Sequence, residues 1–376
     1  MTDFLVALLP KGKNRGAVLV MGLDRIGDFI IWFQSAKELG RIYPDQEMVL
    51  LASPIIVDFA LRLGYWDQVW PFQRDRFGSS VLYRSRLLFK IRRFGFDVAM
   101  NPLREFRISD SIIRVSAARE RIGSNGNETY RGRAWETAIS DRWYSKIIDA
   151  TPRREGTAIH NFFEFVNGIQ RGNIKPRLPC IPRRAFDVPH WTVGMGSYYV
   201  LFMGCSDMFR AWPIERFIVV AGRLWREFGL KGVICGGTQE IQMASRVLKA
   251  APKNSLISVT GKTTICELIG IINQAKLYIG NETGAAHIAA AVRCPAVCIT
   301  GGGDFGYFMP YPADLRSGDR PLPVAVYQKM DCFKCVWKCI HPVKEGDPAP
   351  CISAITIDKV WEVICQLLGR NRDVTV

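Results

Sequence analysis

The residue types best suited to chemistry in this chain lie around position 283. Leu277–Ile279 reads as the end of an apolar strand, Gly280–Thr283 as a tight turn, and Gly284 onward as a helix of small residues. The first N–H groups of such a helix have no partner within it, and the helix dipole adds partial positive charge, so an anion such as a diphosphate is stabilised there. His287 falls in the first turn and can add a side-chain donor. A plain strand–turn–helix unit whose alanines pack beneath a sheet is the alternative.

Asp28 is the second candidate. It follows the apolar strand Ala17–Met21 and a turn that opens at Gly22, and it precedes a helix expected over Phe29–Ile42. A carboxylate in that place can cap the helix, which is the role that the residues alone favour. It can also act as a general base that takes the proton of an attacking hydroxyl group.

Four cysteines form the third candidate, a metal site. They are Cys332, Cys335, Cys339 and Cys351, and the spacing of the first pair is typical of a structural zinc or iron site. Reduced buried thiols and a disulfide are the two other interpretations. All eleven cysteines lie after residue 179, so no disulfide framework runs through the whole chain, and most thiols are expected to be reduced.

The composition fits a globular protein of two domains. The chain has 376 residues, of which 48% are hydrophobic and 23% are charged. It has no run of about 20 apolar residues and no signal-peptide pattern, so we expect a cytoplasmic protein.

The net charge of +15 is unevenly distributed. The segment 74–154 has eighteen Lys and Arg against nine Asp and Glu, an excess that favours a polyanionic partner. The sequence has no zinc-finger spacing, helix-turn-helix or aromatic RNA-binding motif, so we expect no nucleic-acid partner. An anionic membrane surface or an anionic glycan fits better, and a protein peripheral to the inner face of the cytoplasmic membrane is one form of this expectation. A solvated basic face without a partner is the alternative.

Strand-length apolar runs alternate with helical patterns in two series, which predicts two doubly wound α/β domains with parallel sheets. The first series runs from 17 to 123 and the second from 198 to 300. Between them, the segment 124–187 is rich in Arg, Pro and Gly, and we expect it to be a linker with one helix over 158–169.

The expected domains are 1–190, 191–355 and a terminal piece, 356–376, whose helix packs back on the N-terminal domain. Because ligands of such sheets bind beyond the carboxyl ends of the strands, we expect the site in a cleft between the domains.

Four motifs follow one another along the chain. They are Leu23-Asp24-Arg25-Ile26-Gly27-Asp28, Arg210-Ala211-Trp212-Pro213, Thr260-Gly261-Lys262-Thr263-Thr264 and Gly280-Asn281-Glu282-Thr283-Gly284-Ala285-Ala286-His287. In this order, the motifs resemble glycosyltransferase family 9, the ADP-heptose:lipopolysaccharide heptosyltransferase family. The resemblance implies a GT-B fold, in which two Rossmann-like domains face a central cleft.

The resemblance also implies an activity. It suggests an inverting, metal-independent transfer of a sugar, a heptose from an ADP-linked donor, to a phosphorylated or lipid-linked glycan of the lipopolysaccharide type. Asp28 would then be the catalytic base, and no cofactor would be required. The residues implied in donor binding are Ser206, Arg210, Glu240, Thr263, Glu282, Thr283, Gly284 and His287. Similar proteins have aspartate where this chain has Glu282, which puts the identity of the donor in doubt.

Two other classes of protein are considered. A nicotinamide-dependent dehydrogenase also pairs α/β halves, but no Gly-x-Gly-x-x-Gly opens the first unit of this chain. A non-catalytic protein of the same fold that binds an anionic glycan or a nucleotide is the second. It would be expected to lack the base, whereas Asp28 is present.

Overall fold

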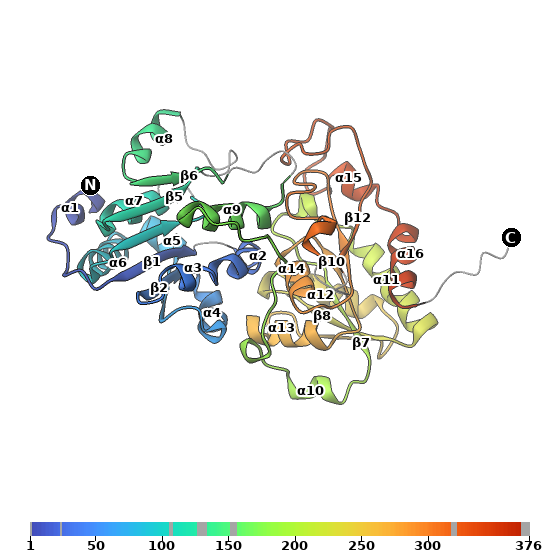
Figure 1. Ribbon diagram of the computed structural model, residues 1–376. Helices are drawn as coiled ribbons and strands as arrows, with labels where there is room; N and C mark the ends of the chain where they lie inside the picture. Colours follow the sequence, from blue (N-terminus) through green and yellow to red (C-terminus); the bar gives the residue numbers. More distant parts are fainter. Residues whose placement is uncertain are drawn as a thin grey trace. The chain divides into compact units, whose positions relative to one another are not determined.

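The computed structural model describes residues 2–22, 25–104, 108–125, 134–150, 156–316 and 322–369 (Figure 1). These residues form two compact units, Met1–Arg177 and Leu178–Val376. The expected linker, 124–187, instead contributes two helices and a strand to the first unit, and the units divide within its proline-rich end.

The N-terminal unit contains a parallel sheet with the strand order β3-β2-β1-β4-β5-β6. Successive strands are added on one side of β1 up to β3 and on its other side from β4 onward, so the strand order reverses between the parallel neighbours β1 and β4, where Val18 lies opposite Val98. This order is that of a Rossmann-type sheet, and such a reversal is a preferred ligand site. The strands are β1 (Ala17–Gly22), β2 (Glu47–Ala52), β3 (Gln68–Pro71), β4 (Val98–Asn101), β5 (Glu120–Ser124) and β6 (Lys146–Ile148).

Helices cover this sheet, and glycines in the left-handed region end two of them, at Gly64 and Gly95. The single helix expected over 29–42 is two helices, and α1, α5, α8 and β6 are not among the elements expected from the sequence. The helical segments are α1 (Thr2–Leu8), α2 (Ile26–Ala36), α3 (Leu39–Ile42), η1 (Pro54–Ile56), α4 (Val57–Leu63), α5 (Arg74–Ser79), α6 (Val81–Phe94), α7 (Ile108–Ser116), α8 (Ala134–Asp141) and α9 (Ala158–Gln170).

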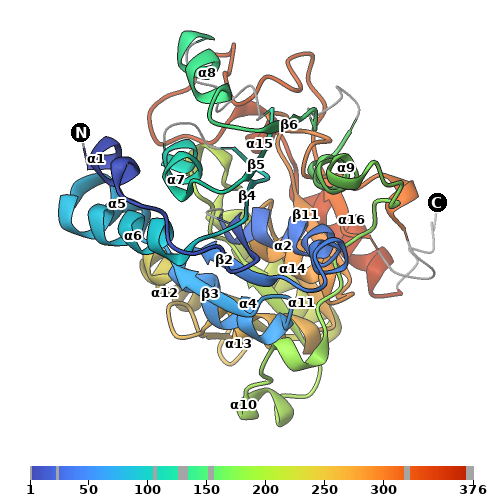
Figure 2. The ribbon, with the colours of Figure 1, turned by 60° about the vertical axis from the view of Figure 1, so that its left-hand side comes forward.

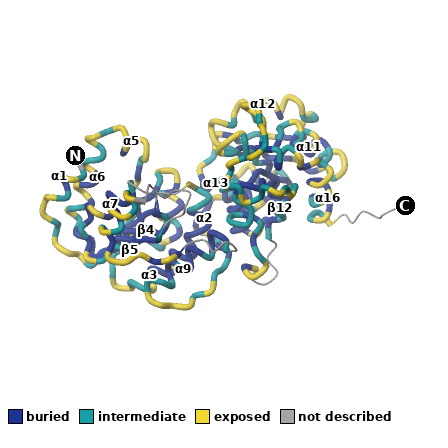
Figure 3. The backbone as a smooth tube through the Cα atoms, turned by 90° about the horizontal axis from the view of Figure 1, so that it is seen from above, coloured by how far each residue is buried: buried dark blue, intermediate teal, exposed yellow. Residues whose placement is uncertain are grey.

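Helices α1, α6 and α7 lie side by side (Figures 1 and 2), and they share one hydrophobic core with the sheet. The strands hold its centre, since every residue of β1 is buried. In Figure 3 the strands β4 and β5 are drawn as buried, whereas α1 and α5 carry exposed stretches.

The C-terminal unit repeats the plan with the strand order β12-β11-β10-β7-β8-β9. The reversal lies between β7 and β10, where Phe202 is opposite Gly280. The strands are β7 (Tyr198–Phe202), β8 (Lys231–Cys235), β9 (Leu256–Ser258), β10 (Leu277–Asn281), β11 (Ala296–Ile299) and β12 (Val324–Val326).

Sequence signals for helix starts are confirmed in this unit. Pro213 is the N-cap residue of α11. Thr264 and Glu267, which have the spacing typical of a capping box, form the capping box of α13, in which Thr264 N–H donates to Glu267 Oε2 at 2.8 Å. The helical segments are η3 (Arg183–Ala185), α10 (His190–Val193), η4 (Met208–Arg210), α11 (Ile214–Phe228), η5 (Thr238–Glu240), α12 (Ile241–Ala250), α13 (Ile265–Gln274), α14 (Gly284–Ala291), η6 (Ala313–Leu315), α15 (Pro350–Ser353) and α16 (Ile357–Leu367).

The last helix, α16, was expected to pack on the N-terminal domain, and this stays a prediction. Its apolar face, with Val360, Trp361 and Ile364, is buried in the core of the C-terminal unit against α11, β11 and β12. An amphipathic pattern predicts that one face of a helix is covered, but it does not say by which domain. The predicted fold class is confirmed, because both units are doubly wound parallel α/β domains.

Candidate functional site

The reversal point of the C-terminal sheet brings two predicted site residues to one edge. Arg210 ends η4 in the loop after β7, and Glu282 directly follows β10. The buried amide of Asn281 joins the two loops, since its Oδ1 accepts the Trp212 N–H at 3.0 Å and its Nδ2 donates to the Met203 carbonyl at 2.7 Å. Sequence reasoning included Asn281 in a motif without assigning it this role.

Glu282 is a buried acidic residue with a raised pKa. Its side chain is buried, and neither carboxylate oxygen has a hydrogen-bond partner. Burial raises the pKa of this carboxyl to about 8, although the Arg210 guanidinium lowers it, and Asp304 adds to the increase. A buried carboxyl without partners destabilises a fold unless a ligand supplies them, so Glu282 is a strong candidate for a binding residue.

Arg210 is contacted by an aromatic ring and by a carboxylate, and one of its donors has no hydrogen-bond partner. Its guanidinium carbon lies 4.4 Å from the centre of the Trp337 ring, and Nη2 lies 3.9 Å from Asp304 Oδ2. Its Nε is buried and has no hydrogen-bond partner. A cation with an unused donor beside an unpartnered carboxyl can bind both the charged and the hydroxyl parts of one ligand.

Thr283, Gly284 and His287 lie at the start of α14, as expected. Thr283 is the N-cap residue, but its side chain does not cap the helix. Its buried hydroxyl makes no hydrogen bond of good geometry, although it lies close enough to the Tyr278 phenol to offset part of the increase in pKa that burial causes there.

His287 is buried, and its Nδ1 lies 2.6 Å from the Tyr311 hydroxyl. Burial lowers the pKa of His287 to about 4, so the ring is neutral at pH 7. A neutral imidazole can donate one hydrogen bond to a phosphate, but it adds no positive charge.

The other predicted donor residues lie in neighbouring loops. Ser206 is exposed after β7, and Thr263 is half-buried after β9. Glu240 follows β8, and its Oε2 accepts the Gly237 N–H at 2.7 Å, so the carboxylate caps this turn. It also faces the end of β7, because a Cβ on Gly204 would lie 2.9 Å from the Glu240 carboxyl carbon.

Asp28 lies in the first turn of α2, beyond the carboxyl end of β1, and is half-buried. The N-cap residue is Arg25, whose side chain makes no capping hydrogen bond. Leu23 and Asp24 of the same motif lie outside the described residues. Asp28 thus lies near the reversal point of the N-terminal sheet, in the first turn after β1.

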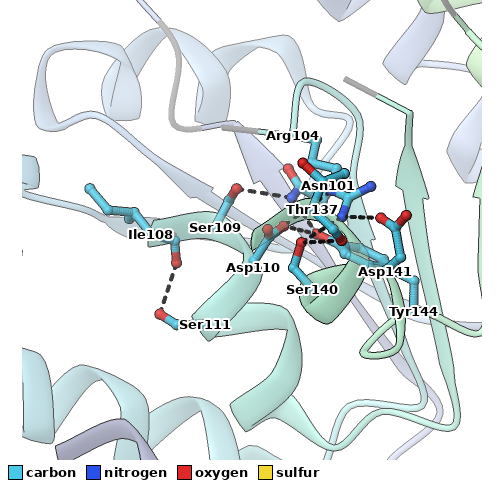
Figure 4. A network of polar contacts seen from close by, with 10 residues as sticks. All are labelled: Asn101, Arg104, Ile108, Ser109, Asp110, Ser111, Thr137, Ser140, Asp141 and Tyr144. Atoms are coloured by element: carbon cyan, nitrogen blue, oxygen red, sulfur yellow. Dashed lines mark hydrogen bonds and ion pairs between the residues drawn. The ribbon is translucent and has the colours of Figure 1, made fainter. Parts of the chain in front are cut away.

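A buried polar network occupies the end of the neighbouring strand, β4 (Figure 4). Arg104 is 1% exposed, and its Nη2 donates to Ser140 Oγ at 2.8 Å and to Asp141 Oδ1 at 2.5 Å. The Tyr144 hydroxyl donates to Asp110 Oδ1 at 2.6 Å and accepts from an amide on β4. The φ of Arg104 is +27°, a conformation that non-glycine residues rarely adopt, so the network overrides the local preference.

The four cysteines of the predicted metal site line one cavity of about 10 Å³, together with His341. None of the four is in a disulfide, which excludes that interpretation for this structure. Burial raises the pKa of both Cys335 and Cys351. Across the ranges that the structure describes, no three potential ligands already stand in coordinating geometry.

The cavity nevertheless has a donor set that suits a soft metal. Thiolates and an imidazole are the usual ligands of structural zinc and iron, and the cavity has room for about one small occupant. Cys332, Cys335, Cys339 and Cys351 would hold such an ion, whose contribution would be to stabilise the loop.

Sequence reasoning missed Asp304 and Trp337, which frame Arg210, and Tyr311, which contacts His287. Asp304 follows Gly301-Gly302-Gly303 at the end of β11, and this position beyond a strand was the available signal. Trp337 lies between Cys335 and Cys339, and the spacing of the cysteines gives no signal for a role of the residue between them.

With these features in place, the protein is a two-domain transferase of the GT-B type. A family model for glycosyltransferase family 9 (heptosyltransferase) matches residues 86–322, and the chain belongs to this family. The predicted class of enzyme, a glycosyltransferase, is confirmed.

The relatives agree with this assignment. A lipopolysaccharide heptosyltransferase 3 of Escherichia coli is 28% identical over 299 residues, which cover 77% of this chain and 84% of the relative. The structure of E. coli ADP-heptose LPS heptosyltransferase II matches 94% of this chain and 99% of its own, with a TM-score of 0.71 and 16% identity. The iron-containing dodecameric glycosyltransferase TibC of enterotoxigenic E. coli matches 96% of this chain and 77% of its own, with a TM-score of 0.56 and 15% identity.

Proposed function

We propose that this protein transfers a heptose from ADP-heptose to a hydroxyl group of a phosphorylated or lipid-linked glycan of the lipopolysaccharide type. The observation that carries the proposal lies at the reversal point of the C-terminal sheet, where the buried carboxyl of Glu282 and the buried Nε of half-buried Arg210 have no hydrogen-bond partner. Relatives named as lipopolysaccharide and ADP-heptose heptosyltransferases support this choice of donor and acceptor.

The donor is bound by the C-terminal unit in this proposal. Arg210, Thr283, the N–H groups that begin with Gly284, and neutral His287 contact the diphosphate, with Ser206 and Thr263 in the adjoining loops. Glu282 accepts hydrogen bonds from sugar hydroxyl groups. The Glu240 carboxylate lies where a ribose hydroxyl can be bound, beyond the carboxyl end of β8.

The reaction is a single displacement with inversion that requires no metal. Asp28 takes the proton of the acceptor hydroxyl as its oxygen attacks the anomeric carbon, and the bond from that carbon to the diphosphate oxygen breaks. ADP leaves with the bonding electron pair, and Arg210 and the N-terminus of α14 stabilise its charge. The basic segment 74–154 attracts the phosphorylated acceptor.

The first experiment follows thermal stability with ADP, GDP, UDP and NAD. ADP at 100 times its Kd should stabilise the protein by about 2.7 kcal/mol, and NAD should not stabilise it. Transfer from ADP-heptose is then measured, with the anomeric configuration of the product determined by NMR. Stabilisation by NAD alone, or ADP binding without transfer to any glycan acceptor, would refute the proposal.

Gly284→Val tests the location of the diphosphate. A branched side chain at the first residue of α14 blocks the approach of the phosphates, so ADP binding should be lost while the fold is kept. Gly40→Val is the matched control, because a side chain at this helical glycine of the other unit meets open space. Equal ADP affinity in the two variants would move the diphosphate elsewhere.

We also propose a structural zinc or iron ion at the cysteine cavity, with no part in catalysis. A structural relative is described as iron-containing, and the thiols here line one cavity. Metal analysis of protein purified without chelators should give about one equivalent, and Cys332→Ser with Cys335→Ser should lose it together with stability. Fully folded, metal-free protein would leave reduced thiols as the explanation.

A peripheral site on anionic membranes is the third part of the proposal. None of the helices in the described ranges has the length and apolarity to cross a bilayer. Helix α1 exposes Leu5 and Leu8, at 56% and 68%, and the adjoining α6 exposes Leu82 at 60% and Phe89 at 48%. Exposed basic side chains on and near α6 are Lys13, Arg15, Arg86, Lys90 and Arg93.

Apolar side chains beside basic ones suit the boundary between lipid head groups and acyl chains, where each basic residue contributes about 1 kcal/mol. Leu5→Glu with Leu82→Glu should therefore abolish sedimentation with vesicles that contain anionic lipid. Val219→Glu, at an exposed apolar position of α11, is the control and should sediment as the unchanged protein does. Equal binding to zwitterionic vesicles would contradict the electrostatic part.

A further inference from the structure

The loop 332–339 reaches the donor site as well as the thiol cavity. Trp337, between two of the cysteines, places its indole ring 4.4 Å from the Arg210 guanidinium carbon. Its Nε1 donates a hydrogen bond to Asp304 Oδ2 at 2.6 Å, and the same carboxylate lies 3.9 Å from Arg210 Nη2. The Trp337 side chain thus contacts both the Arg210 guanidinium and the Asp304 carboxylate beside it.

We propose that Trp337 is a positioning residue that holds Arg210 and Asp304 ready for the nucleotide diphosphate. The inference rests on the proposed function, in which Arg210 contacts phosphate, and it extends the donor site to the cysteine loop. In this proposal the effect of Trp337 on the reaction passes through Arg210, whose guanidinium it contacts.

The backbone of the loop shows how firmly Trp337 is held. Lys334, Val336 and Trp337 have positive φ values of 68°, 52° and 59°, a conformation that is unfavourable for non-glycine residues. The Lys334 and Val336 N–H groups donate to the carbonyls of Gly302 and Gly303 at 2.7 and 3.0 Å. Such strain persists only where the surrounding contacts determine the conformation.

The glycines after β11 are part of the same arrangement. A Cβ on Gly301 or Gly303 would lie 2.4 or 2.3 Å from the Trp337 ring, so the indole rests directly on this turn. Because Asp304 follows the turn, the ring and the carboxylate are fixed relative to each other. The side chains of residues 301 and 303 therefore have to be absent for the indole to reach Arg210.

Positioning matters because an arginine side chain is flexible. Fixing one costs side-chain entropy, and this cost lowers the affinity when it arises during binding. The indole covers one face of the guanidinium, and the indole N–H occupies the Asp304 oxygen that lies nearest to Arg210. Arg210 is therefore oriented in the free protein, and its buried Nε has no hydrogen-bond partner there.

The test compares Trp337→Leu, Trp337→Phe and Arg210→Ala by calorimetric titration with ADP and with adenosine. Trp337→Leu should weaken ADP binding roughly tenfold and leave adenosine binding unchanged, because only the phosphates contact Arg210. Trp337→Phe keeps the ring face and loses the N–H group, so it should recover most of the affinity. With ADP-heptose, kcat/KM of Trp337→Leu should fall, because Arg210 contacts the diphosphate both in the bound donor and in the departing ADP.

The outcomes distinguish a failure of the proposed donor site from a failure of the positioning role of Trp337. If Arg210→Ala binds ADP as tightly as the unchanged protein, the proposed donor site is wrong. If Arg210→Ala weakens ADP binding but Trp337→Leu does not, only the positioning role is overturned. An equal loss of ADP and adenosine binding in both Trp337 variants would indicate general damage and would also overturn it. Trp337→Leu added to Arg210→Ala should cause no further loss.

Discussion

The two units share a strand order but treat buried charge in opposite ways at the point where that order reverses. In the N-terminal unit, Arg104 is fully buried and donates hydrogen bonds to the carboxylate of Asp110 in α7 and to Ser140 and Asp141 in α8. Within this network, Asp110 Oδ2 has no hydrogen-bond partner. In the C-terminal unit, Glu282 has no partner and Arg210 keeps an unused Nε. The first arrangement stabilises a structure, and the second is ready for a ligand.

This difference teaches how to distinguish a structural cluster from a binding site when both are buried and charged. Removing one member of a cluster whose hydrogen bonds are satisfied lowers the free energy of unfolding of the protein. A buried group without partners instead destabilises the free protein, and it contributes to affinity when a ligand supplies the partners. The position beyond the end of a strand alone would have treated Arg104 and Arg210 alike.

The largest expected effect is on the chemical step. Asp28→Asn keeps the size of the side chain but cannot accept a proton, so turnover should fall by about 10²–10⁴-fold. The affinity for ADP should stay the same, because the donor residues lie in the other unit. Turnover near that of the unchanged protein would remove Asp28 from the mechanism and leave it as an acidic residue in the first turn of α2.

The N-terminal network should respond strongly to the loss of its cation. Arg104→Met leaves buried Asp110 without its charged partner, and the free energy of unfolding should fall by about 3–5 kcal/mol in urea titrations. Arg119→Met is the control, because Arg119 is 72% exposed and its ion pairs should contribute at most about 1 kcal/mol. Similar losses for both arginines would mean that the network is not what stabilises this unit.

The C-terminal site should show itself in the pH dependence of stability without ligand. The pKa of Glu282 is about 8, above the ordinary 4.5, so between these values the folded state keeps a proton that the unfolded state releases. Stability therefore falls as the pH rises, by up to about 1.4 kcal/mol per pH unit. His287, with its pKa lowered from 6.5 to about 4, has the opposite effect, but only below about pH 6.5.

The range from pH 6.5 to 8 therefore isolates Glu282. The unfolding free energy should fall by about 2 kcal/mol over this range, and Glu282→Gln should remove the decline. A variant that keeps the full decline would show that another group is responsible.

The smallest expected effect concerns Glu240. Glu240→Gln keeps an oxygen that can accept the Gly237 N–H, so thermal stability should change little. If the carboxylate also binds the ribose, ADP affinity should fall about fivefold, the loss of about 1 kcal/mol expected when a charged acceptor becomes neutral. Unchanged affinity for ADP and adenosine would limit Glu240 to capping.

The sequence predicted the parts of the site that follow from local rules. Arg210 and Glu282 come after strands that are adjacent in a doubly wound sheet, so their proximity follows once the strand order is known. The capping box at Thr264 was likewise readable from spacing. Alternating elements were sufficient for the fold class.

The rest depended on tertiary contacts that have no local pattern. The loop that brings Trp337 to Arg210 has positive φ values at Lys334, Val336 and Trp337. None of the three is glycine, so residue preferences do not predict this backbone conformation. The Arg104 network joins residues up to 43 positions apart without a motif. For α16 the buried face was predictable, but its partner was not.

The place of α16 in the C-terminal core has a consequence for synthesis on the ribosome. Tyr199 and Trp361 belong to the same core, although 162 residues separate them. That core cannot close until residues near 365 have been made, whereas the N-terminal unit is complete in sequence by residue 177. At roughly 5–20 residues per second, the half-finished C-terminal sheet exposes apolar strands for on the order of ten seconds or more. Chaperones and early termination should therefore affect the C-terminal unit far more than its N-terminal counterpart.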